Sequence, residues 1–205
     1  MGDRRQHWES LYQTRASDSV SWFQPHALTS LRLIEGCCPN RNAPVIDIGG
    51  GASVLVDDLL AAGYRDLTVL DLAQAALATS RARLGARADA VRWVAADITR
   101  ATLPAAHYAV WHDRAVFHFL TDADDRARYV AQVLHAVRPG GHVIVAAFGP
   151  NGPLQCSGLD VVRYDPASLH GEFGAPFRLL GHRTEIHHTP SGKEQEFVYC
   201  YCLRT

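Results

Sequence analysis

The sequence has no long apolar run and no excess of charge of either sign. Its 205 residues include 20 Lys and Arg against 21 Asp and Glu, which gives a formal net charge of −1. A nucleic-acid surface needs a clustered excess of basic charge, so we expect no nucleic-acid partner. No apolar segment approaches the roughly 20 residues that a membrane helix needs, so we expect no membrane partner either.

The sequence also lacks the marks of export. Residues 1–5 lead into a polar segment without the apolar region of a secretory signal. The five cysteines are an odd number without framework spacing, which favours a reducing compartment, and we expect a cytoplasmic protein. Cys200 and Cys202 share one face of a predicted strand but are poorly spaced for zinc. We therefore expect both to be buried apolar residues and predict no metal site.

The most informative segment is residues 45–53, where a strand, a glycine turn and a helix start follow one another. Residues 45–48 are apolar and β-branched around one carboxylate, and Ser53 opens a helical pattern after the glycines 49–51. This order is typical of a nucleotide-binding corner, because glycine lets the backbone pass close to a ligand. A tight turn in an α/β protein without such a ligand is the alternative.

Asp47 indicates which nucleotide the corner suits. A carboxylate two residues before the first glycine would repel a diphosphate and suits a ligand with a positive group, such as an amino acid ammonium. The dinucleotide pattern Gly-x-Gly-x-x-Gly would also need glycine at position 54, where the chain has Val54. A nicotinamide-dependent reductase is therefore disfavoured. The chain follows Asp-x-Gly-x-Gly-x-(Gly or Ser) instead, with Asp47, Gly49, Gly51 and Ser53.

Strands and helices alternate along the chain. Apolar stretches predict strands at residues 45–48, 67–71, 91–96, 108–112 and 142–148, and a closing hairpin at 177–187 and 194–203. Helical spacing predicts helices at residues 4–13, 25–36, 53–62, 74–84, 121–136 and 166–173. Residues 138–141 are predicted to form a turn and 149–158 a loop. We therefore expect an α/β fold: a Rossmann-like, doubly wound, seven-stranded sheet, mostly parallel, with an antiparallel strand in the C-terminal hairpin.

No repeat, linker or low-complexity tract divides the chain, so we predict a single domain over residues 1–205. Within it, residues 1–36 are an N-terminal helical and aromatic lid segment and residues 43–148 a cofactor-binding core. Residues 149–205 are a substrate loop and the C-terminal hairpin.

Acidic residues end, or lie near the end of, four successive predicted strands: Asp47, Asp71, Asp97 and Asp113. Ligands of open α/β sheets bind at the carboxyl ends of the strands. One such carboxylate alone more often caps a loop, but the ordered series after a glycine corner indicates a ligand site. Asp71 suits two ribose hydroxyls, and Asp97 suits an adenine amino group.

In residues 43–148 the chain resembles class I S-adenosylmethionine-dependent methyltransferases, whose motifs match residues 45–53, 69–71, 95–98 and 137–148. Residues 113–129, together with the early aromatic pair Trp22 and Phe23, resemble the thiopurine and tellurite-resistance branch of that class. The branch has glycine where this chain has Ala115.

The resemblance implies S-adenosylmethionine as the cofactor. The glycine loop with Asp47 would face the methionine half, and Asp71 the ribose. Asp97 would bind the adenine, with Leu72 and Ile98 against the ring. Trp22 would lie over the methyl group as a lid, or else plug the core. The cofactor-binding residues that we expect are Trp22, Asp47, Gly49, Gly51, Ser53, Asp71, Leu72, Asp97, Ile98 and His112.

Four residues are candidates at the reacting end of the site: Asp113, Arg114, His118 and Cys156. Asp113, with His112, would line the floor between sulfonium and substrate. Arg114 would bind an anionic group of the substrate, or pair with Asp113 or Asp122. His118 would be a base or a packed histidine. Cys156 would face the substrate from the loop that follows the fifth strand.

We expect the protein to methylate a small soft nucleophile: a thiol, or a selenium, tellurium or other metalloid compound. Methyl transfer from a sulfonium releases a neutral leaving group, so it needs no acid, and a soft anion needs no base. A protein lysine methyltransferase and a non-catalytic S-adenosylmethionine-binding module remain alternatives. The expected partner is a small-molecule substrate, and the sequence leaves the oligomeric state open.

Overall fold

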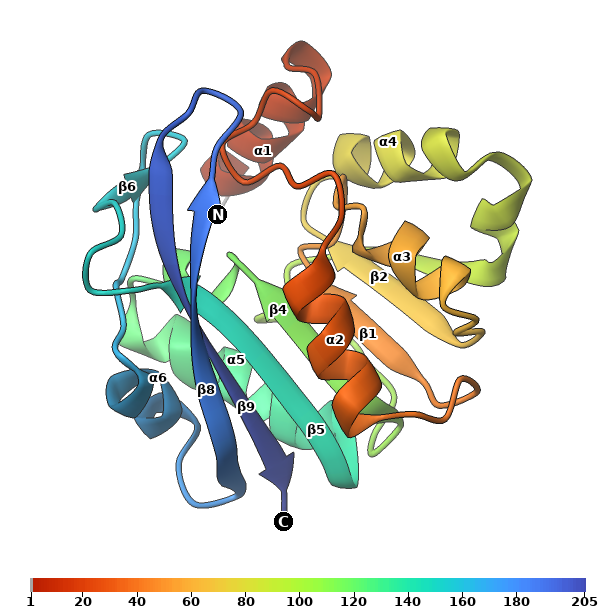
Figure 1. Ribbon diagram of the computed structural model, residues 1–205, viewed down its shortest axis with the longest axis vertical. Coiled ribbons are helices and arrows are strands. Elements are labelled where there is room, and N and C mark those ends of the chain that lie inside the picture. The colour runs from red at the N-terminus through yellow and green to blue at the C-terminus, as the bar shows by residue number, and fades with distance from the viewer. Residues whose placement is uncertain (1) are drawn as a thin grey trace.

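A seven-stranded sheet, in the order β3-β2-β1-β4-β5-β9-β8, forms the centre of the molecule (Figure 1). The computed structural model describes residues 2–205, so Met1, the first residue of the predicted lid segment, lies outside the described residues. The strands are β1 Val45–Ile48, β2 Leu67–Asp71, β3 Val91–Ala95, β4 Tyr108–Arg114, β5 Val137–Phe148, β8 Phe177–His188 and β9 Glu194–Arg204. β9 is antiparallel to both of its neighbours, and the other neighbouring pairs are parallel. The predicted doubly wound sheet with an antiparallel hairpin strand is confirmed.

Helices cover both faces of this sheet. One face packs against α2 Leu28–Cys37, α3 Leu55–Ala61 and α4 Gln74–Leu84, and the other against α5 Ala123–Ala136 and α6 Pro166–Phe173. Because strand side chains alternate, Val45 of β1 belongs to the first core and Ile46 to the second. All residues of β1 and β2 are buried, which explains why these strands form continuous apolar runs in the sequence.

Side-chain caps fix two helix starts where the sequence placed them. Asp122 accepts hydrogen bonds from the second and third backbone N–H groups of α5, and Asp165 forms a capping box with Ser168 at the start of α6. The predicted start of the second helix at Pro25 is wrong: α2 begins at Leu28. The preceding Ala27 donates its N–H to the Asp58 carboxylate at 2.8 Å, which holds residues 25–27 in a connection.

The edges of three segments also differ from the prediction. β4 continues beyond the predicted end at residue 112, because Asp113 and Arg114 still pair with β5. Residues 138–141 belong to an irregular start of β5 in which Gly140 has a φ of +74°, where a plain turn was predicted. The predicted loop 149–158 contains β6 Gln155–Cys156, which pairs with β7 Leu159–Asp160. Short 3₁₀ helices also occur at Gly85–Ala90 and Phe117–Phe119.

The N-terminal helix α1, Gly2–Thr14, lies over the carboxyl ends of the central strands beside α4 (Figure 1). Its Glu9 carboxylate accepts the Ala75 N–H at 3.1 Å, which fastens α1 to the start of α4. The rings of Trp8 and Tyr12 contact Trp22, with centroids 5.7 and 6.3 Å apart. No helix within residues 2–205 is long and apolar enough to cross a membrane.

Candidate functional site

Two adjoining hollows lie at the carboxyl ends of the central strands, against α1. The first, here called the glycine-loop hollow, is lined chiefly by Ser30, Asp47, Gly49, Gly50, Ser53 and His112. The second, the strand-end hollow, is lined chiefly by Trp8, Asp71, Leu72, Asp97, Ile98, Phe119 and Cys156. Tyr12, Trp22, Ile48, Gly49 and Arg114 line both. The two hollows therefore form one continuous cleft, at the strand ends where the sequence placed a ligand.

The glycine loop between β1 and α3 is packed so closely that none of its three glycines has room for a side chain. Gly49 has a φ of +67°, and a Cβ there would overlap the Val116 side chain. A Cβ on Gly50 would overlap the Asp47 carboxylate. One on Gly51 would lie 2.5 Å from Asp71 Oδ2. The sequence pattern required only Gly49 and Gly51, and the requirement at Gly50 appears only in three dimensions.

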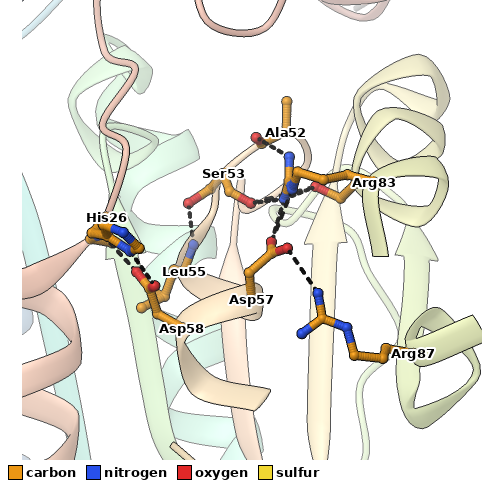
Figure 2. A network of polar contacts seen from close by, with 10 residues as sticks. His26, Ala52, Ser53, Leu55, Asp57, Asp58, Arg83 and Arg87 are labelled. Carbon is orange, nitrogen blue, oxygen red and sulfur yellow. Dashed lines mark hydrogen bonds and ion pairs between the residues drawn. The ribbon is translucent and has the colours of Figure 1, made fainter. Parts of the chain in front are cut away.

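Arg83 of α4 holds the end of the glycine loop in place (Figure 2). Its guanidinium donates to the carbonyl oxygens of Ala52 and Ser53, at 3.1 and 2.6 Å, and to the Asp57 carboxylate at 2.6 Å. The Ser53 hydroxyl accepts the N–H of Leu55, the first residue of α3, at 3.1 Å. The predicted start at Ser53 is two residues early, because α3 begins at Leu55, although the Ser53 hydroxyl binds its first N–H group. A cation on a neighbouring helix fixes the backbone that precedes α3.

Asp47 is buried beneath the glycine loop, with only 4% of its surface exposed. Its Oδ1 accepts a hydrogen bond from His112 Nδ1 at 2.7 Å. Its Oδ2 has no hydrogen-bond partner among the described residues. A buried carboxylate oxygen without a partner is costly, so an Oδ2 beside a hollow suits a ligand that donates a hydrogen bond there.

Asp71 and Asp97 line the strand-end hollow as the sequence predicted. Asp71 accepts the N–H groups of Gly51 and Ala73 at 3.0 and 2.8 Å, which ties the end of β2 to the glycine loop. Burial raises the pKa of Asp71 to about 6. Asp97 accepts from the N–H and hydroxyl of Thr99, at 2.9 and 2.8 Å. Leu72 and Ile98 stand beside these carboxylates in the wall of the hollow.

Arg114, the last residue of β4, lines both hollows, and its side chain is only 10% exposed. Its Nε donates to the Tyr199 hydroxyl at 3.0 Å, and its Nη2 lies 3.4 Å from Glu185 Oε1. The guanidinium also stacks over the Phe197 ring, 4.1 Å from the centroid. The pairing with Asp113 or Asp122 that the sequence suggested is wrong, because Arg114 pairs with Glu185 of β8.

The expected place of Asp113 on the floor of the site is also wrong. Because β4 extends through Arg114, alternation turns Asp113 to the face opposite His112 and Arg114. There it is fully buried and accepts the Tyr129 hydroxyl at 2.6 Å and the Val116 N–H at 2.9 Å. Burial raises its pKa to about 7. Asp113 therefore holds α5 and the turn after β4, and lines neither hollow.

His118 is the packed histidine of the two predicted possibilities. It is fully buried among aromatic rings, 4.5 Å from both Phe119 and Phe148 between centroids, and lines neither hollow. Its Nδ1 accepts the Phe148 N–H at 3.2 Å. Burial lowers its pKa to about 3, so the ring is neutral near pH 7. Nothing in this position connects His118 to the cleft.

Cys156 faces the strand-end hollow from β6, as the sequence predicted for the loop after the fifth strand. It is 4% exposed, and burial raises the pKa of its thiol to about 11. Cys156 is therefore a protonated thiol near neutral pH. Cys200 and Cys202 are buried apolar residues of β9, as expected.

Several residues of the cleft left no usable signal in the sequence. Ser30 forms a hydrogen bond with His112, 82 residues away in the sequence, and Tyr199 accepts one from Arg114, 85 residues away. Glu185 approaches only because β8 lies beside β9. Trp8 and Tyr12 carried a weaker signal, because an aromatic pair at i, i+4 spacing marks one face of a helix.

Residues 45–141 match the family model described as a methyltransferase domain. Among curated proteins, the eEF1A lysine and N-terminal methyltransferase of Mus musculus is 24% identical over 144 residues, which cover 67% of this chain and 20% of that protein. The match thus spans about a fifth of the length of this curated relative.

Solved structures with low sequence identity share the fold. The structure solved for the conversion of a disulfide bond into a thioacetal group during echinomycin biosynthesis has a TM-score of 0.76 at 15% identity, and the match covers 98% of this chain and 92% of that one. Burkholderia thailandensis 1,6-didemethyltoxoflavin-N1-methyltransferase, with bound 1,6-didemethyltoxoflavin and S-adenosylhomocysteine, has a TM-score of 0.73 at 19% identity. The match covers 100% of this chain and 88% of that one. A TehB-like S-adenosylmethionine-dependent methyltransferase from Corynebacterium glutamicum ATCC 13032 has a TM-score of 0.64 at 14% identity. The match covers 100% of this chain and 97% of that one.

Proposed function

We propose that this chain uses S-adenosylmethionine to methylate a small, soft nucleophile, a proposal supported by the match of residues 45–141 to a methyltransferase-domain model. The acceptor is a thiol, or a selenium, tellurium or other metalloid compound. The observation that carries this proposal is the wall of the strand-end hollow, which is aromatic and sulfur-containing and offers no free base.

The cleft fits the cofactor from end to end. Asp47 Oδ2, buried and unpaired within the described chain, would accept the amine of the methionine half. Asp71 would accept from the ribose hydroxyls, and Asp97 from the adenine amino group. Leu72 and Ile98 would hold the ring. The loop residues Gly49 and Ser53 would pass under the ligand, with Trp22 and His112 beside it. Gly51 lines neither hollow and would act by leaving room for Asp71.

The acceptor end of the strand-end hollow is apolar and aromatic. Trp8 packs edge-on against both Trp22 and Phe119, with centroids 5.7 and 5.1 Å apart, and Cys156 completes this wall. Such a surface suits a polarizable acceptor, because sulfur and aromatic groups attract one another through dispersion. The neighbour solved for a disulfide-to-thioacetal conversion supports a sulfur acceptor, and the toxoflavin enzyme supports a small substrate.

The titratable groups along the cleft are hydrogen-bonded or assigned to the cofactor, and we infer that none remains to act as a base. Asp71 and Asp97 accept backbone N–H groups, His112 is bonded at both ring nitrogens, and Asp47 Oδ2 is assigned to the amine. Burial raises the pKa values of Cys156 and Tyr12 far above neutral pH. A nucleophile that needed deprotonation would find no partner here, whereas a thiolate or a metalloid lone pair needs none.

The contribution of the chain to catalysis is therefore positioning and the exclusion of water. When bound, the cofactor supplies an electrophilic methyl group whose neutral leaving group needs no acid. The aromatic wall holds the acceptor in line with that methyl group, and α1 shields the cleft from solvent. Alignment of this kind is worth about 7–11 kcal/mol of the barrier. Arg114 would bind an anionic group of the acceptor through the N–H groups that Tyr199, Glu185 and the Trp22 carbonyl leave free.

The test is turnover of the full chain with S-adenosylmethionine and a panel of small acceptors. The panel comprises aliphatic and aromatic thiols, selenite, tellurite and, as a hard counterpart, catechol. We expect S-adenosylhomocysteine and a methylated product with members of the soft set, and loss of both in an Asp97→Ala variant. Methylation confined to catechol, or to none of the panel, contradicts the proposal.

The similarity to an eEF1A lysine and N-terminal methyltransferase favours one second candidate, a protein lysine methyltransferase. A lysine ammonium must lose a proton before it attacks the methyl group. In this proposal the carboxylates and His112 of the cleft already have hydrogen-bond partners or are assigned to the cofactor, which disfavours them as the base. Incubation of the chain with labelled S-adenosylmethionine and lysate proteins separates the two candidates. Label transferred to protein, with no turnover on small thiols, selects the second one.

A further inference from the structure

A series of largely buried hydrogen bonds links Arg114, which lines both hollows, to Asp47 in the glycine-loop hollow. Arg114 Nε lies 3.0 Å from the Tyr199 hydroxyl, which lies 3.5 Å from the Ser30 hydroxyl. Ser30 Oγ lies 2.8 Å from His112 Nε2, and His112 Nδ1 lies 2.7 Å from Asp47 Oδ1. Tyr199, Ser30, His112 and Asp47 are all buried, and the sequence separations along the chain run from 65 to 169 residues.

The donor and acceptor directions in this series of hydrogen bonds follow from the chemistry of its end residues, Arg114 and Asp47. The guanidinium of Arg114 can only donate, and the carboxylate of Asp47 accepts. If His112 is neutral with its proton on Nδ1, Tyr199 donates to Ser30, Ser30 to His112 Nε2, and His112 to Asp47. Every hydroxyl then both accepts and donates once. With a proton on Nε2 as well, Ser30 would accept from His112, and one hydroxyl hydrogen, on Tyr199 or on Ser30, would have no acceptor among these five residues, which is costly for a buried group.

We propose that Ser30, Tyr199 and Arg114 are positioning residues that hold His112 as the Nδ1–H tautomer, so that Asp47 presents its Oδ2 to the amine of the cofactor. Donors arranged in one direction polarise each other and strengthen the final bond to the carboxylate. With Oδ1 occupied, only Oδ2 remains for the ligand. The inference rests on the proposed contact between Asp47 and the amine, and the identity of the methyl acceptor does not enter it.

The decisive experiment compares two ligands in binding calorimetry: S-adenosylhomocysteine, and its analogue with the α-amine replaced by hydrogen. Tyr199→Phe removes the hydroxyl group in the middle of this series of hydrogen bonds, and Tyr199 itself lines neither hollow. We expect it to weaken S-adenosylhomocysteine binding roughly three- to tenfold, the size of one lost hydrogen bond, and to leave the analogue unchanged. Ser30→Ala, one bond closer to His112, should have the same selectivity. Tyr201→Phe, two residues along the same strand, is the matched control and should change neither ligand.

Asp47→Asn separates failure of the inference from failure of its premise. If Asp47→Asn weakens both ligands equally, Asp47 does not bind the amine and the proposed cofactor contact is wrong. If Asp47→Asn weakens only the ligand that carries the amine, but Tyr199→Phe and Ser30→Ala do not show this difference, the contact between Asp47 and the amine stands. The positioning role of Ser30 and Tyr199 is then refuted. Equal weakening of both ligands by Tyr199→Phe reports a structural effect and also refutes it.

A spectroscopic readout is independent of any ligand. The ring ¹⁵N signals of His112, assigned by their loss in a His112→Gln variant, distinguish the two neutral tautomers and the doubly protonated ring. We expect the Nδ1–H tautomer in the free protein near neutral pH, retained in Tyr201→Phe. An Nε2–H tautomer, or a doubly protonated ring, overturns the inference.

Discussion

Gly51 has no room for even one extra methyl group. A Cβ there would overlap Ala76 of α4 and lie 2.5 Å from Asp71 Oδ2. Gly51→Ala should therefore displace Asp71 and lower the free energy of unfolding by roughly 1–3 kcal/mol through overpacking. Because Asp71 is assigned to the ribose, the affinity for S-adenosylhomocysteine should also fall at least about tenfold. Chemical denaturation and calorimetry measure the two effects.

Gly36 provides the matched control. It lies within α2, and a Cβ there meets nothing within 4 Å. Gly36→Ala should raise stability by about 0.5–1 kcal/mol, because alanine loses less conformational freedom in a helix. It should leave ligand affinity unchanged. Equal effects of the two substitutions would show that the glycine loop is looser than its contacts indicate.

His118 should make the protein sensitive to mild acid. Its pKa falls from the ordinary value near 6.5 to about 3 on folding, because the ring is buried. As the pH falls below about 6.5, the unfolded chain binds a proton at this residue and the folded chain does not. The free energy of unfolding therefore decreases by up to about 1.4 kcal/mol per pH unit from this group, down to about pH 3. His118→Gln should remove this part of the slope.

Denaturation curves between pH 7 and 4 measure the effect as a difference between variant and parent. The raised pKa values of Asp71 and Asp113 act in the opposite direction, but they contribute equally to both proteins and cancel. Parallel slopes for His118→Gln and the parent would sink the prediction.

Among elements, α4 makes its charged contact with the glycine loop through Arg83, while Ala76 and Ser80 add an apolar contact and a weaker hydrogen bond. Arg83 donates to two loop carbonyls and to Asp57 (Figure 2). Arg83→Met keeps much of the apolar stem and removes these hydrogen bonds, which as bonds to a charged group are worth about 1.5–3 kcal/mol each when measured alone. We expect faster amide exchange in residues 50–55 and roughly tenfold weaker binding of S-adenosylhomocysteine.

Arg87 is the control on the same helical surface. It reaches only Asp57, at 3.9 Å, and its side chain is 57% exposed. An exposed pair of this kind contributes at most about 1 kcal/mol. Arg87→Met should leave both exchange and affinity near the parent values, and matching losses in the two variants would contradict a specific role for Arg83.

Elements were predictable from the sequence where burial and glycine act locally. β1 and β2 are buried on both faces, so their apolar runs gave their bounds, and Asp165 gave the start of α6. The end of β4 was not predictable, because Asp113 and Arg114 are polar residues that stay in the strand only through pairing with β5. That two-residue error assigned Asp113 to the cleft, whereas it faces Tyr129.

For the whole molecule, ligand binding should appear as a rise in melting temperature. A ligand present at one hundred times its dissociation constant stabilises the folded state by about 2.7 kcal/mol. For a chain of this length that corresponds to a rise of roughly 5–10 °C. We expect the rise with S-adenosylhomocysteine and none with NADH, because the buried carboxylate beneath the glycine loop disfavours a diphosphate. A rise with NADH alone contradicts the assignment of the site.

At this scale the cleft residues proposed to hold the cofactor were predictable, because they follow β1, β2 and β3 in chain order. The partners of Arg114 were not. Arg114, Tyr199 and Glu185 meet only after β9 is placed between β5 and β8, and no local pattern encodes a contact across 71 or 85 residues.

The position of β9 has a consequence for how the chain is assembled. β8 precedes β9 in the chain but reaches the sheet only through it, since β9 lies between β5 and β8. While the polypeptide emerges from the ribosome, β8 lacks its partner strand until β9 has been made. A chain cut short before Glu194 would therefore lose two strands from its sheet, and with them both side chains that anchor Arg114.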